Sequence, residues 1–446
     1  MEHSAYCALV DKHRETILDT ERHIWRHPET GFKEWKTSAY LADIFERAGY
    51  TLTRAGDIPG FYTDLDTGRP GPKLLILGEL DALAAPSHAE AVDGCAHACG
   101  HNAQCAALIG IALALKEPGA LDGLCGSIRL MAVPAEELIE IAYRDSLRRQ
   151  GIIRYLGGKP EFLWRGYLDG VDLAFMVHTT VSSDTVFSCR AGSNGCMTKE
   201  AVYTGVAAHA GGSPHLGVNA LYAASLGLQA VNALRETFQD GDHVRVHPIL
   251  AAGGASVNII PAEAKLSSFV RGATMEVIRE TNEKVNRALA AGALALGAGV
   301  TVSDRPGYAP LVNDPGMMAV AKDCMTALVG ADKVDFNTSW GCGSTDMGDL
   351  SCIMPVVHPY VSGASGIGHG DDYRIADPET ACVLSAKAQV MMAAELLRDN
   401  AAKAKAVLAG SRPRYASKED YFAAVDAFIA DRSLIVYGDG GAEIQF

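Results

Sequence analysis

The stretch KLLILGELDAL, residues 73–83, places a short buried strand directly before acidic side chains. Residues 74–77 form a continuous apolar run, which is typical of a strand covered on both faces. Glu79 and Asp81 follow this run. Each of them could simply cap a turn, but the same arrangement returns twice further along the chain.

The two later stretches are SIRLMAVPAEE (127–137), which ends in two glutamates, and VDLAFMVHTT (171–180), in which a strand over 173–177 is followed by His178. Apolar strands that alternate with helical segments predict a largely parallel α/β sheet. Because sites in such sheets form at the carboxyl ends of the strands, we expect these polar groups to gather at one edge.

Length and charge limit the class of protein. The chain has 446 residues, 48% of them hydrophobic and 21% charged, and a net charge of −14. A chain this long exceeds one hydrophobic core and predicts two or three domains. The acidic balance argues against nucleic acid or an anionic membrane as a partner, since both require a basic surface.

The N-terminal sequence is charged from its start and lacks the apolar region of a signal peptide. Apolar spacing predicts helices over 4–25 and 36–48. We expect no membrane-spanning run; residues 288–300 come closest but are too few. The eleven cysteines show no framework spacing, so we expect reduced thiols and a cytoplasmic protein.

A second folding unit is predicted between about 190 and 305. Its order of elements, strand–helix–strand–strand–helix–strand, is that of a ferredoxin-like α+β sandwich. The expected domains are therefore a first part over 1–189, an inserted domain over 190–308, and a second part over 309–446 that ends in a helix and a tail.

The stretch HACGHN (97–102) opens an apolar helix and predicts a metal site. Cys99 and His101 are two residues apart, so in an extended segment they point the same way. His97 would point the same way, but three ligands from five residues would strain the geometry. We therefore expect His97 to contact the ligands without binding the metal itself. Asn102 is expected to cap the helix. Thiolate, imidazole and carboxylate together suit zinc, with manganese or cobalt as alternatives.

The adjacent Glu136 and Glu137 could have different roles at such a site. If one binds metal, the other can act as a general base on a water whose pKa the metal lowers to about 7. Each of these residues also has a possible non-catalytic role. The glutamate pair could simply begin a helix, and His178 could be a structural residue. The joint placement of all candidates at strand ends or a helix start favours the metal site.

The chain contains, in this order, the motifs GELDAL, HACGHN, VPAEE, MVHTT, GVAAHAGGSPHLGVNAL, GGASVNIIPAEA, GSTDMGD and GIGHGDD. Together they resemble the dinuclear-metal amidohydrolases, the metallopeptidase family that includes aminoacylases, carboxypeptidase G-type enzymes and auxin-conjugate hydrolases. The resemblance covers roughly residues 10–400. GELDAL, CGHN and STDMGD are most similar to the aminobenzoyl-glutamate hydrolase branch.

The resemblance implies a metallopeptidase catalytic domain with an inserted lid or dimerisation domain, and two divalent ions per subunit. It implies a bridging role for Cys99, an orienting role for Asp81 and a general acid–base role for Glu136. His209 would polarise the scissile carbonyl. The implied metal ligands are Cys99, His101, Glu137, His178 and His369; the implied substrate-binding residues are Asn258 and Arg271, and Arg190 is a second candidate for binding the substrate's carboxylate.

Two features depart from the family pattern. After PAEE, relatives carry a glycine-rich stretch, whereas this chain has the bulkier segment 138–168, which leaves the substrate open. His358 rivals His369, but Gly368 and Gly370 leave room for a metal at His369.

The predicted function is metal-dependent hydrolysis of an N-acyl or N-aroyl amino acid. The alternatives are a dipeptidase of the β-alanyl-lysine type, which the acidic balance would favour, and a metal-free relative without catalysis. The apolar residues of the helix over 218–238 extend beyond one buried stripe, so a homodimer is also expected.

Overall fold

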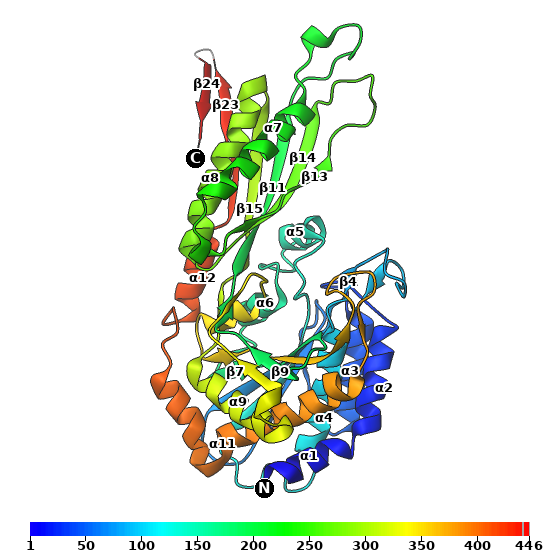
Figure 1. The fold of residues 1–446 in the computed structure, drawn as a ribbon, viewed down its shortest axis with the longest axis vertical. Helices are drawn as coiled ribbons and strands as arrows, with labels where there is room; N and C mark the ends of the chain where they lie inside the picture. The colour runs from blue at the N-terminus through cyan, green and yellow to red at the C-terminus, as the bar shows by residue number, and fades with distance from the viewer. Residues whose placement is uncertain (439–440, 446) are drawn as a thin grey trace. The chain divides into compact units, whose positions relative to one another are not determined.

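The computed structural model describes residues 1–438 and 441–445 and divides into two compact units. The larger unit contains residues 1–192, 312–340 and 349–416, and the smaller contains 193–311, 341–348 and 417–446. The chain passes between the units near β10 (Gly192–Ser193), β16 (Leu311–Val312), β18 (Trp340–Gly341) and α10 (Met347–Ser351), and again between residues 416 and 417. Figure 1 labels helices and strands of both units and colours the chain by residue number.

The larger unit contains a six-stranded sheet with the order β1-β2-β6-β3-β7-β19. β3 pairs in parallel with β6 and β7, whereas β2 pairs antiparallel to β6, so the expected mixed, largely parallel sheet is confirmed. Glu79 pairs with Val133, so the residues that follow β3 and β6 emerge side by side. The strands are β1 (Thr53–Arg54), β2 (Phe61–Asp66), β3 (Lys73–Glu79), β6 (Ser127–Val133), β7 (Leu173–Phe175) and β19 (Val356–Val357).

A second sheet of the larger unit has the order β17-β9-β20-β21, and β8 pairs with β20. β7 ends at Phe175, two residues before the end of the predicted strand 173–177, and His178 begins β8. The strands are β8 (His178–Val181), β9 (Phe187–Cys189), β17 (Val334–Phe336), β20 (Tyr360–Ser365) and β21 (Arg374–Ile375), and β4 (Leu83–Ala84) pairs separately with β5 (Cys95–Ala96).

Helix α4 (His101–Lys116) is the central helix of the larger unit. It packs on β3, and α2 and α11 pack on it, so nearly all of its residues are buried. It begins at His101 after Gly100, whose φ is 91°, so the expected cap at Asn102 is wrong; that amide donates to Glu21 instead. The other helices are α1 (His3–Asp11), α2 (Arg14–Trp25), α3 (Trp35–Arg47), α5 (Ile141–Arg149), α6 (Gly158–Trp164), α9 (Pro315–Val329) and α11 (Ser385–Gly410).

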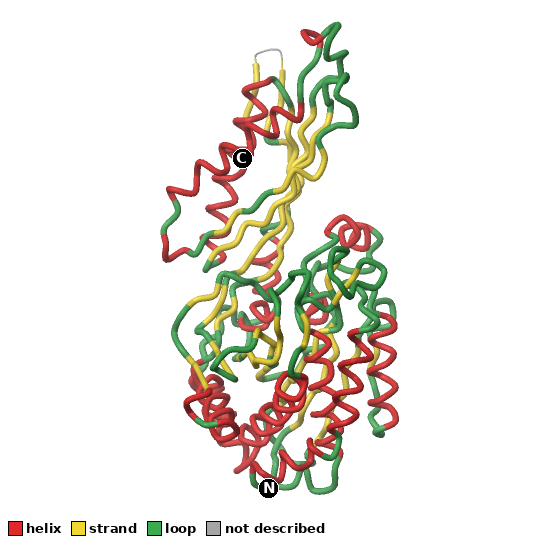
Figure 2. Tube along the Cα trace, turned by 45° about the vertical axis from the view of Figure 1, so that its right-hand side comes forward, coloured by secondary structure: helices red, strands yellow, loops and turns green. Residues whose placement is uncertain are grey.

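The smaller unit contains the expected ferredoxin-like sandwich. Its antiparallel sheet has the order β12-β14-β11-β15-β22, with β13 also on β14. Helices α7 and α8 pack on each other and lie along the strands, as Figures 1 and 2 show. The elements are β11 (Gly195–Thr204), α7 (Ala220–Ala233), β12 (Arg245–Val246), β13 (Ile249–Ala252), β14 (Glu263–Gly272), α8 (Met275–Leu296) and β15 (Gly299–Tyr308).

The C-terminal residues belong to the smaller unit, whereas the sequence placed them with the larger one. β22 (Ala430–Ser433) pairs antiparallel with β15, and Arg305 binds both carboxylate oxygens of Asp431 at 2.8 and 3.0 Å. This strand covers the polar backbone edge that β15 would otherwise expose. The remaining elements are α12 (Lys418–Asp426), β23 (Ile435–Gly438) and β24 (Gly441–Ile444).

One helical stretch among the described residues, Glu379–Gly410, is long and apolar enough to cross a membrane by length and composition alone. No such run was expected from the sequence. Because 83% of its most apolar window is buried inside the protein, and non-helical backbone interrupts it at 398–401, it is a core element of the larger unit.

Candidate active site

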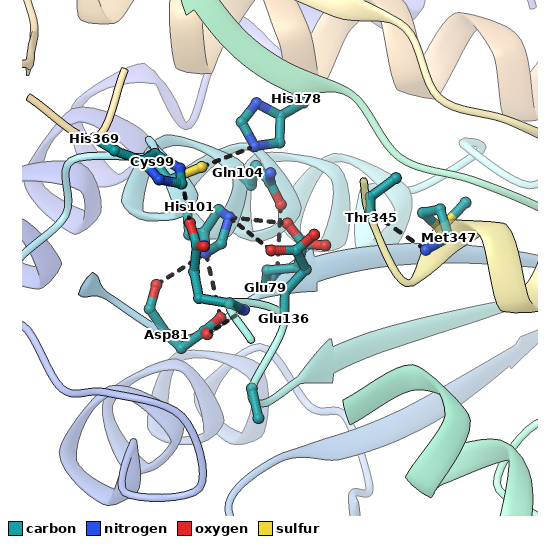
Figure 3. Close-up of polar contacts among 12 residues, drawn as sticks. Glu79, Asp81, Cys99, His101, Gln104, Glu136, His178, Thr345, Met347 and His369 are labelled. Atoms are coloured by element: carbon teal, nitrogen blue, oxygen red, sulfur yellow. Dashed lines mark hydrogen bonds and ion pairs between the residues drawn. The ribbon is translucent and has the colours of Figure 1, made fainter. Parts of the chain in front are cut away.

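His101 lies at the centre of a polar cluster in the larger unit, shown in Figure 3. Its Nδ1 is 2.9 Å from the Asp81 carbonyl oxygen and 3.2 Å from Asp81 Oδ1. Its Nε2 is 3.2 Å from Glu79 Oε2 and 4.0 Å from Glu136 Oε2. Asp81 therefore accepts the Nδ1 proton, and Nε2 points at the two glutamates. In the neutral ring, the form that binds a metal, this nitrogen would offer its lone pair.

Cys99 and His178 meet on another side of the cluster. Cys99 Sγ is 3.4 Å from His178 Nε2, and His178 Nδ1 is 2.7 Å from the carbonyl oxygen of Thr179. The carbonyl can only accept, so His178 Nδ1 donates, and Nε2 offers a lone pair next to the thiol. Both histidines thus present the same ring nitrogen to the cluster.

Glu137 and His369 close the arrangement. Glu137 Oε1 is 3.3 Å from His369 Nε2, and the Glu137 backbone N–H donates to Asp81 Oδ2 at 2.8 Å. His369 adopts a left-handed backbone with φ 63°, and its N–H donates to the Ala98 carbonyl at 2.8 Å. This bond ties the late histidine to the segment that carries Cys99.

The ligand atoms form overlapping groups, and Cys99 belongs to two of them. All atoms of a group lie within 4.8 Å of one another, and three of the groups are Cys99, His101 and His178; Cys99, Glu137 and His369; and His101, Glu136 and Glu137. Within the described part of the chain, Glu79 Oε2, His101 Nε2 and Glu137 Oε1 are buried without a hydrogen bond. Converging buried lone pairs without donors are unfavourable, so this donor set fits divalent cations.

Charge around the cluster is strongly coupled. Burial favours the neutral form of Glu79, yet the charges of Lys159 and His101 lower its pKa to about 2. Lys159 and Glu79 form an ion pair in which neither side chain is exposed. Burial, and then the charge on His101, lower the pKa of His178 to about 4, so this imidazole is neutral near pH 7 and able to bind a metal.

Two other histidines lie beside the cluster without joining any of the groups. His97 and His358 are buried, and neither ring makes a hydrogen bond within the described residues. Burial lowers the pKa of each to about 3. The His358 ring lies 5.8 Å from the His178 ring, whereas His369 contacts Glu137, so the geometry favours His369 as the late ligand.

His209 and Asn258 lie together in the smaller unit. An isolated bridge pairs His209 with Ile259, and the Ala210 N–H donates to the Asn258 carbonyl at 3.0 Å. His209 Nδ1 accepts the backbone N–H groups of Gly211 and Gly212 at 3.2 and 2.9 Å. In the neutral ring the proton therefore resides on Nε2, which is available as a donor.

Arg271 does not join His209 and Asn258. On the β11–β14 ladder, Arg271 pairs with Cys196 at one end, and the other end, Thr204 opposite Glu263, leads to His209 and Asn258. At ~3.3 Å of rise per residue, the two positions are more than roughly 25 Å apart. Arg190, the other candidate for the substrate's carboxylate, lies exposed in the larger unit.

Several polar residues around the cluster were not predicted. Lys159 and Arg144 come from the segment 138–168, and Glu34 accepts a hydrogen bond from Ala135 N–H at 2.7 Å. The Tyr373 hydroxyl donates to the Cys99 carbonyl at 3.3 Å. One indication of Lys159 and Arg144 was present in the sequence: both cations belong to the segment that follows the acidic motif PAEE.

The chain belongs to peptidase family M20/M25/M40, whose family model matches residues 61–398. One of the p-aminobenzoyl-glutamate hydrolase subunits of Escherichia coli is 31% identical over 298 residues, which are 64% of this chain and only 56% of that protein. The human Xaa-Arg dipeptidase is 27% identical over 390 residues, 83% of this chain and 81% of that protein.

The fold also has solved counterparts. A dinuclear metal binding M20 peptidase from Bacillus subtilis superposes with a TM-score of 0.65 at 20% identity, covering 87% of this chain and 99% of that one. The resemblance to this family, and to its aminobenzoyl-glutamate hydrolase members, is confirmed. The chain is accordingly a hydrolase that acts on amide bonds.

Metal binding should release a proton from Cys99. Burial, and then the Glu137 carboxylate, raise the pKa of this thiol well above its usual range, so a metal must displace its proton. We expect zinc affinity to rise with pH, and wild-type protein to release about one proton more than Cys99→Ser. Calorimetry in buffers of different ionisation enthalpy measures this number.

The matched control for this titration is Cys95→Ser, which removes a half-buried thiol outside the ligand groups. This variant should behave as wild type. Equal proton release by wild type and Cys99→Ser, or full activity after exhaustive chelation, would contradict the metal site.

Proposed function

We propose that this protein hydrolyses the amide bond of an N-acyl or N-aroyl amino acid with two divalent metal ions. The observation that carries the proposal is the position of Cys99, whose sulfur belongs to two ligand groups at once. The sulfur groups with His101 and His178, and also with Glu137 and His369, so these five residues would hold the two ions. Zinc, manganese and cobalt all suit these donors.

When bound, the ions would lower the pKa of water and polarise the substrate carbonyl. Glu136 lies next to this position, with Oε2 4.0 Å from His101 Nε2. It would accept a proton from the attacking water and return that proton to the leaving amine. Asp81 would keep His101 in the tautomer that directs Nε2 inward.

His209 and two arginines are proposed to bind the substrate. The exposed His209 ring, with its proton on Nε2, can donate to the carbonyl oxygen as negative charge develops there. Arg271 is suited to a carboxylate, because its guanidinium donates to Ser344 Oγ at 3.2 Å while its Nε is buried without a hydrogen bond in the described structure. Arg190 remains a second candidate.

We also propose that the protein is a two-fold dimer formed through the smaller unit. Strand β13 is exposed along its whole length, with Ile249 63% and Leu250 44% exposed. The outer face of α7 adds Tyr222 at 63% and Leu226 at 43%. A second copy would cover these apolar side chains. His209 and Asn258, far from Arg271 in one chain, would then serve the active site of the partner.

A basic dipeptide is the second candidate substrate, favoured by the human Xaa-Arg dipeptidase relative and by the net charge of −14. A metal-free relative without catalysis is the third candidate; the presence of all five proposed ligands and Glu136 argues against it. A hydrolysis screen with zinc, manganese and cobalt over N-aroyl amino acids, N-acyl amino acids and basic dipeptides separates these alternatives.

Substitution of Glu136 and substitution of Glu137 should affect metal binding and turnover differently. Glu136→Gln should retain metal and lose about 10²–10⁴-fold in kcat, since it removes the general base. Glu137→Gln should bind metal more weakly as well, because it removes a proposed ligand. Metal content by mass spectrometry and kcat on the best substrate distinguish the two variants.

The matched control is Glu140→Gln, whose carboxylate binds Lys33 and Thr30 outside the ligand groups. It should retain both metal and turnover. An active Glu136→Gln, with normal metal in both variants, would refute the assigned roles.

The dimer proposal is tested by mixing two inactive subunits, His209→Ala and Glu136→Gln. If His209 serves the partner's site, each hybrid dimer contains one site with both residues intact and should regain roughly half of a wild-type dimer's activity, since one of its two sites is complete. No recovery despite demonstrated subunit exchange would place His209 in its own subunit's site. A monomeric mass in solution would contradict the dimer itself.

A further inference from the structure

The loop that carries Glu136 and Glu137 has an unusual backbone. Ala135 adopts a left-handed conformation with φ 57°, although it is not glycine. Such a conformation persists only where the surrounding structure holds it. The loop must therefore be fixed by contacts from outside, and these contacts set the directions of both glutamates.

Polar contacts hold the loop from several sides. Glu34 accepts from Ala135 N–H at 2.7 Å, and Asp81 accepts from Glu137 N–H at 2.8 Å. The Gly158 N–H donates to the Ala135 carbonyl at 3.2 Å. The carbonyls on both sides of Glu136, those of Ala135 and Glu137, also accept from one guanidinium, that of Arg144.

Arg144 is fully buried; its two Nη groups donate to backbone oxygens, whereas its Nε makes no hydrogen bond in the described structure. Its Nη1 donates to the carbonyls of Ala135 at 3.3 Å and Leu156 at 2.6 Å, and its Nη2 donates to the Glu137 carbonyl. Within the described residues it makes no ion pair. A buried cation without a direct carboxylate partner is unfavourable, so an arginine at this position calls for a specific role.

A glycine, Gly31, leaves the space that this guanidinium occupies. A Cβ on Gly31 would lie 2.2 Å from Arg144 Nη2 and 3.0 Å from Ala135 Cα. Only glycine therefore allows the guanidinium to lie against the loop. Arg144 comes from α5 and Gly158 from the start of α6, both within the segment 138–168.

We propose that Arg144 is a positioning residue that links the carbonyls before and after Glu136 and so fixes the directions of Glu136 and Glu137. The proposal rests on the proposed function, because it acts through the base and the ligand named there. A planar guanidinium binds two carbonyls in a fixed fork, which a lysine ammonium cannot reproduce.

Two variants disturb this contact from opposite sides. Arg144→Lys keeps the charge and loses the fork, whereas Gly31→Ala keeps Arg144 and displaces its guanidinium. We expect each to raise the dissociation constant for zinc by about tenfold. At saturating zinc, kcat should still fall by about tenfold with little change in KM, because Glu136 is misdirected. Arg148→Lys, on the same helix and paired with Asp145, is the control and should match wild type.

The zinc titration separates this proposal from the proposed function. If wild-type protein binds zinc but hydrolyses none of the screened amides, the proposed function fails while the affinity comparison still tests Arg144. Wild-type zinc affinity and kcat in both variants, together with a lower unfolding temperature, would make Arg144 merely structural and overturn the proposal. Failure of both variants to fold would overturn it equally.

Discussion

The candidate site depends on the interactions of one side chain, the carboxylate of Asp81. Its Oδ1 lies 3.2 Å from His101 Nδ1, and its Oδ2 accepts the Glu137 N–H at 2.8 Å. One side chain after β3 thus joins the first residue of α4 to the loop after β6. This is possible because β3 and β6 pair in parallel and in register, so that both strands end at the same edge.

The burial of so many acidic groups requires compensation. Glu79 and Asp81 are completely buried, and Glu136 and Glu137 are each only 7% exposed. Lys159 neutralises Glu79, and Arg144 directs its charge toward the loop carbonyls. Divalent cations would neutralise the remaining charge, and they would also use the lone pairs of His101 and Glu137 that lack hydrogen bonds. The negative charge that makes the burial of these carboxylates unfavourable also makes them strong ligands for divalent cations.

The sequence predicted the parts of the fold that depend on local pattern. The apolar run at 74–77 and the helices and strands of the inserted domain were visible because their periodicity is strong. The C-terminal strand β22 was not, since its sequence ADRS carries two charges and joins the sheet only through the free edge of β15. Tertiary pairing, rather than local propensity, made it a strand.

The candidate site was foreseen to a similar extent. Cys99, His101, Glu137, His178 and His369 come together as expected, because each lies in a conspicuous motif. The separation of His209 from Arg271 depends on the register of a ladder, which residue spacing does not show. Arg144 and Lys159 were missed because buried cations in a helical segment resemble ordinary surface residues in sequence.

The most direct test of the role of Asp81 is a zinc titration of Asp81→Asn beside Asp93→Asn, an exposed aspartate nearby in the chain. The asparagine side chain has one acceptor oxygen, so it cannot face both His101 Nδ1 and the Glu137 N–H as the carboxylate does. His101 keeps the Asp81 backbone carbonyl as an acceptor, but the link between His101 and the Glu137 loop is lost. We predict zinc binding at least tenfold weaker in Asp81→Asn than in wild type or Asp93→Asn. Unchanged zinc affinity in folded Asp81→Asn would contradict the central role of this carboxylate.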